Sequence, residues 1–241
     1  MAGRRLFVFA STLLLVGLYF SFLTADYLTR DPYGSFSRTA KYGAILLCLG
    51  LTLAIGGEGH DRRDTWTLRL AFVLTAIADF VIGILGHFVA GVGVFLLVQI
   101  VYMVRHSRGF AWNRKEVWSL LLILGLCAAV FFRMSADLEE KGLFLPVLVY
   151  SLALALSLWL AIGTFWRKFF PRTMDFFIAY GMIAFFFCDL SVALASLERS
   201  FAAQLVWFFY LPAQFLLALS GFRVGFLRSV YPLVPELKEP Q

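Results

Sequence analysis

The amino-acid sequence predicts an all-α integral membrane protein with eight transmembrane helices in one bundle. Hydrophobic residues make up 61% of the 241-residue chain and charged residues only 15%, which is more apolar surface than a soluble domain of this length can bury. Apolar segments close to the ~20 residues that cross a hydrocarbon core recur along the whole chain. The basic residues are also unequally divided between alternate loops, as in membrane proteins with a defined orientation.

Eight apolar segments justify the helix count. They cover residues 6–25, 42–57, 67–86, 88–104, 117–132, 143–166, 174–196 and 201–222. The first follows two arginines, as a signal peptide would, but its length is that of a spanning helix, so we expect it to remain uncleaved. The second, fourth and fifth are short and are expected to extend into their loops. Because lipid cannot satisfy backbone polar groups, each segment should be helical.

The segments predict one domain and a tail. Residues 1–226 are expected to form a single eight-helix transmembrane domain. Residues 227–241 contain three prolines and several charges, which predicts a disordered cytoplasmic tail. The stretch from 29 to 41 is expected to be a turn-rich loop on the outside.

Lysine and arginine counts set the expected orientation. With a cytoplasmic N-terminus, the inside segments hold 15 of these residues: Arg4, Arg5, Arg62, Arg63, Arg69, Arg105, Arg108, Arg114, Lys115, Arg167, Lys168, Arg172, Arg223, Arg228 and Lys238. The outside segments hold six: Arg30, Arg38, Lys41, Arg133, Lys141 and Arg199. This bias predicts that both termini are cytoplasmic.

Several functions are disfavoured by the sequence. The net charge is +6, but the basic residues are dispersed, whereas nucleic-acid binding needs a continuous basic face. The three cysteines lie in apolar runs and are expected to pack rather than form disulfides. His60, His87 and His106 have no metal-ligand spacing, so neither a metal nor another cofactor is expected. Motifs of serine hydrolases, zinc hydrolases, P-loops and dinucleotide sites are absent.

Two aspartates deep in the apolar segments remain as candidates for chemistry. Asp79 lies in the third segment and Asp189 in the seventh, where a carboxylate costs about 2.5–3.5 kcal/mol on insertion scales. Both segments run in the same direction, and Asp79 lies near the middle of its segment and Asp189 slightly past the middle of its own. The two side chains should therefore lie at similar depth and could share a cavity. The alternative is that each is a protonated group that joins neighbouring helices through a hydrogen bond.

Other polar residues in the segments could line such a cavity. They are Gln99, Tyr102, Tyr150, Tyr210 and Gln214, although each taken singly is more often a packing residue. Lys41 is expected to open the second helix on the side toward which the acids tip. On its own, it can also be a lysine that extends to the membrane interface.

Five stretches in order resemble the lysoplasmalogenase (YhhN-like) family of integral membrane proteins. They are LTAIADFVIGIL, GVGVFLLVQIVY, PVLVYSLALAL, YGMIAFFFCDLSVAL and FFYLPAQFLLALS, and Lys41 matches a family lysine. The resemblance covers residues from about 40 to 222. Four positions depart from the family pattern: Tyr42 replaces a proline, Ala78 a glycine, Gln99 a histidine and Cys188 a serine.

The resemblance implies hydrolysis of the vinyl ether bond of lysoplasmalogen to a fatty aldehyde and a glycerophospho-ethanolamine or -choline. Asp79 and Asp189 would be the acid and base, and Lys41, Gln99, Tyr102, Tyr150, Tyr210 and Gln214 would bind the lysophospholipid. Lys41 would be the contact for its phosphate group. The expected location is the bacterial inner membrane, or an endomembrane in a eukaryote, among membrane lipids.

Two other classes stay open. The first is a proton-coupled transporter, because paired membrane acids also occur in such proteins. Glycine- or proline-broken helices at matching places in the two halves of the chain would favour this class. The four departures from the family pattern keep a non-catalytic lipid-binding or scaffolding membrane protein open. The sequence does not indicate an oligomeric state.

Overall fold

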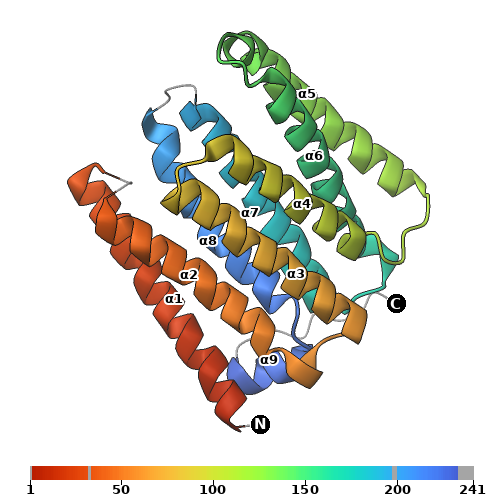
Figure 1. Ribbon diagram of the computed structural model, residues 1–241. Coiled ribbons are helices and arrows are strands. Elements are labelled where there is room, and N and C mark those ends of the chain that lie inside the picture. Colours follow the sequence, from red (N-terminus) through yellow and green to blue (C-terminus); the bar gives the residue numbers. More distant parts are fainter. Residues whose placement is uncertain (1, 32–33, 197–199, 233–241) are drawn as a thin grey trace.

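Helices account for nearly all of the residues that the structure describes. The computed structural model describes residues 2–31, 34–196 and 200–232, and Figure 1 shows their arrangement. The long helices are α1 (Ala2–Thr29), α2 (Ser35–Ala54), α3 (Arg62–Asp79), α4 (Phe88–His106), α5 (Arg114–Glu140), α6 (Phe144–Arg167), α7 (Arg172–Ser196) and α8 (Ser200–Leu219). Three short elements complete the described chain: the 3₁₀ turn η1 (Gly56–Glu58), the π-helical turn η2 (Phe80–Ile84) and α9 (Val224–Val230).

Successive helices run up and down in one bundle. In Figure 1, α1 and α2 form one edge, α5 and α6 form the other, and α3, α4, α7 and α8 lie between them. We call the end where α1 begins the lower end; it also carries α9 and the loops 107–113 and 168–171. The upper end carries the loops 30–34, 85–87 and 141–143.

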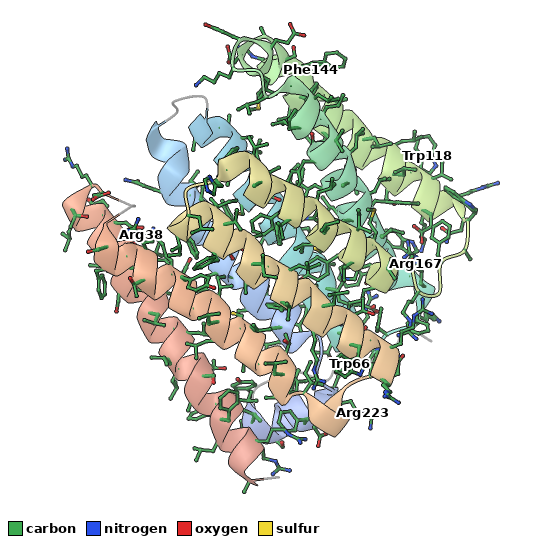
Figure 2. All side chains as sticks on the ribbon, in the orientation of Figure 1. Arg38, Trp66, Trp118, Phe144, Arg167 and Arg223 are labelled. Atoms are coloured by element: carbon green, nitrogen blue, oxygen red, sulfur yellow. The ribbon has the colours of Figure 1, made fainter. Side chains whose placement is uncertain are left out.

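The length and hydropathy of the helices identify a multi-pass membrane protein. Within the described residues, six helices are long and apolar enough to cross a membrane: α1, α3 with η2, α4, α5, α6 and α7. Residues Gln204–Leu219 of α8 pass the same test only when they are taken together with α9. The two helices are bent by 117° relative to each other, and they would be a seventh spanning segment if they form one span. On α5, the side chains of Leu122, Trp118 and Phe132 are 74%, 71% and 77% exposed, a surface that lipid would cover. Figure 2 shows Trp118 on the outside of the bundle.

Two boundary predictions are wrong. The stretch expected to be a turn-rich loop is mostly helical, because α2 begins at Ser35, and Lys41 therefore lies two turns inside it. Disorder was also predicted from residue 227 onward, but residues 227–230 belong to the helix α9. Leu227 and Val230 are buried there, and the Tyr231 hydroxyl contacts Thr12. Packing against α1 gives this short segment the burial that its own composition does not suggest. Residues 233–241 lie outside the described residues.

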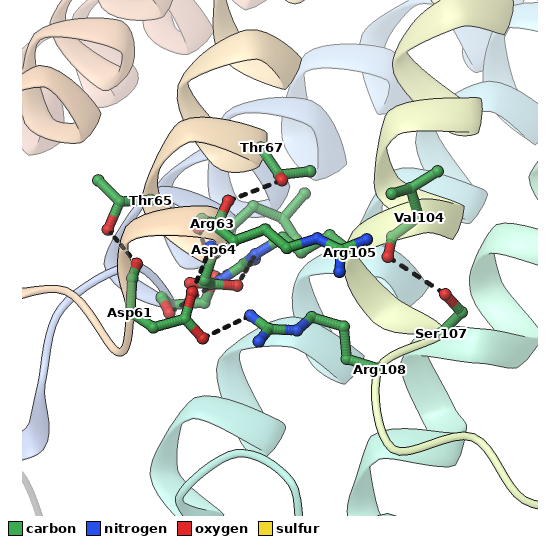
Figure 3. Close-up of polar contacts among 11 residues, drawn as sticks. Asp61, Arg63, Asp64, Thr65, Thr67, Val104, Arg105, Ser107 and Arg108 are labelled. Carbon is green, nitrogen blue, oxygen red and sulfur yellow. Dashed lines mark hydrogen bonds and ion pairs between the residues drawn. The ribbon is translucent and has the colours of Figure 1, made fainter.

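Buried ion pairs hold the lower end together (Figure 3). The Arg105 guanidinium of α4 binds both carboxylate oxygens of Asp64 on α3, at 2.8 and 3.2 Å. It also donates to the hydroxyl and carbonyl oxygens of Ser220, just after α8, at 2.8 and 3.1 Å. The Arg105 and Asp64 side chains are 0% exposed. A single arginine therefore joins three helices.

A second, more exposed pair starts α3. Asp61 caps the helix by accepting the Asp64 amide at 2.8 Å and pairs with Arg108 at 2.6 Å (Figure 3). Burial opposes the charge of Asp61, but the Asp64 amide and Arg108 outweigh this effect and hold the pKa of Asp61 below its usual range.

Candidate active site

A cavity of about 510 Å³ lies in the upper half of the bundle. Residues of α2, α3, η2, α4, α7 and α8 line it, and most of its wall is apolar, including Phe88, Phe95, Val192 and Val206. The volume is typical of a small-molecule site, and a few polar groups converge on it from different helices. These polar groups include the two aspartates.

Asp79 reaches the cavity from the last residue of α3. The Tyr210 hydroxyl of α8 donates a hydrogen bond of 2.6 Å to its Oδ2 atom. Directly after Asp79 the backbone widens into the π-helical turn η2, in which Leu85 N–H bonds to the Phe80 carbonyl five residues back. π-Helical turns are rare and frequently mark functional sites, because they re-aim side chains that a regular helix would hold elsewhere.

Asp189 reaches the same cavity from the middle of α7. The Tyr150 hydroxyl of α6 donates to its Oδ2 atom at 2.7 Å, and the Gln99 amide of α4 donates to that hydroxyl at 3.4 Å. Both aspartates are only partly buried. Each carboxyl group is therefore oriented by one tyrosine and still accessible from the cavity.

Lys41 lines the cavity as half of an ion pair. Its ammonium group lies 2.7 Å from Oδ2 of Asp26 on α1, and Ser37 donates to Oδ1 of the same carboxylate at 2.5 Å. The ammonium also lies 5.4 and 5.7 Å from the ring centroids of Trp207 and Phe22. Lys41 is 3% exposed, so it does not extend toward the membrane interface.

The structure brings some of the predicted site residues together and separates others. Lys41, Asp79, Asp189 and Tyr210 share the cavity wall. Tyr150 bonds to Asp189 and Gln99 bonds to Tyr150, but neither of these two residues is part of the cavity lining. In contrast, Tyr102 and Gln214 are fully buried away from the cavity lining.

Sequence reasoning missed Asp26 and Arg38. Asp26 stands just beyond the first apolar segment, and only the packing of α1 against α2 reveals its pairing with Lys41. Arg38 is exposed at the upper end and lines the cavity (Figure 2). It lies one turn before Lys41, so the i, i+3 spacing could have indicated it if the helix start had been predicted at Ser35.

The arrangement can perform acid–base chemistry on a ligand with an apolar body. Two carboxyl groups face one mainly apolar space, and cationic side chains stand toward its upper end. Among the side chains of the described residues, no three histidine, cysteine or acidic groups converge as metal ligands.

These features define a helical membrane protein with paired intramembrane carboxyl groups around a cavity. The model of the YhhN family matches residues 36–221, from α2 to the end of α8. The chain belongs to the YhhN family, which confirms the resemblance seen in its motifs. No curated protein and no solved structure matches it.

Proposed function

We propose that the protein is a membrane-embedded hydrolase that cleaves the vinyl ether bond of lysoplasmalogen to a fatty aldehyde and a glycerophospho-ethanolamine or -choline. The observation that carries the proposal is the pair Asp79 and Asp189, which come from different helices to one mainly apolar cavity. Membership of the YhhN family supports the same reaction.

Vinyl ether hydrolysis needs an acid and a base. The protonated carboxyl group transfers its proton to the β-carbon of the vinyl ether, which leaves an oxocarbenium ion. A water molecule adds to the cationic carbon and gives a proton to the second, ionised carboxylate. The resulting hemiacetal then breaks into the aldehyde and the free glycerol hydroxyl, and proton exchange between the carboxyl groups restores the start.

The site geometry suits this division of labour. An anion beside the oxocarbenium ion stabilises it strongly where water is excluded, as the paired carboxyl groups of glycosidases do for a similar cation. Tyr210 and Tyr150 orient one carboxyl group each. The glutamine that replaces the family histidine, Gln99, supports Tyr150 and so acts through Asp189.

The substrate would enter with its head group at the upper end. Its single hydrocarbon chain would pack on the apolar wall, and its phosphate would meet Arg38, because Lys41 is already paired with Asp26. Arg38 is therefore the main phosphate contact in this proposal, with Lys41 contributing charge from the wall.

The orientation in the membrane is part of the proposal. We propose that α1 to α8 all span it, with both termini cytoplasmic, in the bacterial inner membrane or a eukaryotic endomembrane. The bias of basic residues supports this topology. Thr29→Cys and Trp112→Cys, both at exposed positions of opposite ends, should react with a membrane-impermeant thiol reagent from opposite sides. Labelling of both from one side would refute the topology.

The reaction is tested by aldehyde release from purified protein and lysoplasmalogen. Asp79→Asn and Asp189→Asn should each lower turnover by at least about 10²-fold, since general acid–base groups typically contribute about 10²–10⁴-fold. The double variant should lose much less than the product of the two, because cooperating groups are not additive. Asp137→Asn, an exposed acid on α5, is the matched control.

The same preparation separates the alternatives. Unchanged aldehyde release by a folded Asp79→Asn or Asp189→Asn variant would exclude the proposed roles. Binding of lysoplasmalogen without aldehyde would indicate a lipid-binding protein, and ion-coupled flux in proteoliposomes would indicate a carrier.

A further inference from the structure

Six fully buried polar side chains lie between the cavity and the lower end. They are Thr75 on α3, Gln99, Tyr102 and His106 on α4, Ser157 on α6 and Gln214 on α8, each 0% exposed. We call this set the polar file. Six of its side-chain atoms outside the His106 ring have no hydrogen-bond partner among the described residues: one each in Thr75, Gln99, Tyr102 and Ser157, and two in Gln214. The His106 ring has the Ser157 backbone as a hydrogen-bonding neighbour.

Helix geometry aligns the polar file beneath the two aspartates. Thr75 precedes Asp79 by four residues in the upward-running α3, and Gln214 follows Tyr210 by four residues in the downward-running α8. Residues four apart share a helix face. The helices of Asp79 and Tyr210 therefore each carry a second buried polar side chain about 6 Å nearer the lower end.

The file continues along α4. Gln99, Tyr102 and His106 are spaced by three and four residues, so they share one face. The Tyr102 and His106 rings stack with centroids 5.4 Å apart, and the backbone of Ser157 lies against the His106 ring. Through its bond to Tyr150, Gln99 links this face to the Asp189 carboxyl group.

The other end of the file meets the charged layer of the lower end. His106 is the last residue of α4, and its carbonyl oxygen accepts a bond of 2.6 Å from Arg167. The adjacent Arg105 belongs to the ion pair shown in Figure 3. Along α4, buried polar side chains thus recur from Gln99, which is linked to the cavity through Tyr150, to His106 at the lower end.

We infer that the polar file binds a chain of ordered water molecules, which supplies the water consumed at Asp79 and Asp189. Buried polar atoms are almost always hydrogen-bonded, and buried waters typically bind about three such groups each. The unpartnered atoms belong to side chains of α3, α4, α6 and α8, so a row of waters between these helices would satisfy them.

The role of this water in catalysis rests on the proposed function. A lysolipid bound with its head group at Arg38 would close the upper entrance, and its hydrocarbon chain would exclude water from the apolar wall. The hydrolytic water would then come from below, past Gln214 and Tyr102. The ionised carboxylate would accept its proton as the oxygen bonds to carbon.

Hydroxyl-radical footprinting of the full chain in lipid nanodiscs tests the water directly. Radiolysis generates the radical from bound as well as bulk water, so Tyr102 and His106 should be oxidised although they are buried. Phe72, which is 0% exposed on α3, is the matched buried aromatic control and should remain unmodified. Tyr102 and His106 as resistant as Phe72 would overturn the inference, and would show that these groups pair with one another instead.

Variants link the water to turnover. Thr75→Val and Gln214→Met keep side-chain size and remove hydrogen bonds, so each should lower oxidation of Tyr102. Each should also reduce kcat by up to about tenfold, the equivalent of one ordinary hydrogen bond, without changing KM. Ser135→Ala, at a partly buried position of α5 outside the polar file, should change neither.

The two readouts separate the inference from the proposed function. Oxidised Tyr102 in a protein that never releases aldehyde would leave the water chain standing and refute the hydrolase. Aldehyde release with an unmodified Tyr102, or with unchanged kcat in both variants, would refute the water chain and leave the hydrolase standing.

Discussion

Removing the charge of Asp64 should strongly destabilise the bundle. Asp64→Asn keeps the size of the side chain but leaves the Arg105 guanidinium buried without a counter-ion, and both side chains are 0% exposed. Breaking a buried pair on one side costs about 3–5 kcal/mol. For a chain of this length, each kcal/mol lowers the melting temperature by about 2–4 °C, so the expected loss is about 6–20 °C.

The assay is thermal unfolding in detergent, followed by tryptophan fluorescence. Asp61→Asn is the matched control: its pair with Arg108 is 35% and 19% exposed, and asparagine retains the cap on α3. It should cost less than about 1 kcal/mol. The double variant Asp64→Leu with Arg105→Met should recover much of the loss, because no unpaired charge remains.

A small change in the melting temperature of Asp64→Asn would refute this reasoning. If Asp64→Asn melts within about 2 °C of the unmodified protein, less than the shift from 1 kcal/mol, the pair does not hold α3, α4 and α8 together.

Two further predictions concern the entrance and pH. Arg38→Gln should raise KM for lysoplasmalogen about tenfold with kcat nearly unchanged, because the loss of a phosphate contact worth about 1.4 kcal/mol weakens substrate binding alone. The control Arg133→Gln on α5 should change neither KM nor kcat. An unaltered KM for Arg38→Gln would exclude the phosphate contact. Since the pKa of Asp61 is held below its usual range, its ionised form should stabilise the fold above about pH 4, and this contribution should disappear as pH falls through the lowered pKa. The difference in melting temperature between the unmodified protein and Asp61→Asn should therefore be larger at pH 6 than at pH 3, and a difference that grows on acidification would contradict it.

The apolar runs of the sequence by themselves determined that this is a helical membrane protein. Lipid leaves a backbone no alternative to internal hydrogen bonds, so segment length and composition suffice to predict helices. The same logic selected Asp79 and Asp189 as candidate site residues, because a carboxyl group inside such a run is costly and usually faces the bundle interior. The ordered motifs also identified the family.

Helix boundaries required the tertiary structure. The beginning of α2 at Ser35 is polar enough to resemble a loop. The helix α9 has only seven residues and is followed by prolines, so the sequence around it resembles a disordered tail. Their helical form depends on contacts with other segments, such as Tyr231 with Thr12. Composition within a short window does not contain those contacts.

Partnerships between side chains were decided only by the packing of distant segments. Lys41 pairs with Asp26 and Arg105 with Asp64, each across two helices. The tyrosines that orient the aspartates are 39 and 131 residues away in the chain. A charge or hydroxyl group takes its partner from whichever helix packs beside it, and the periodicity of a single helix specifies the face it presents but not the neighbour that meets it.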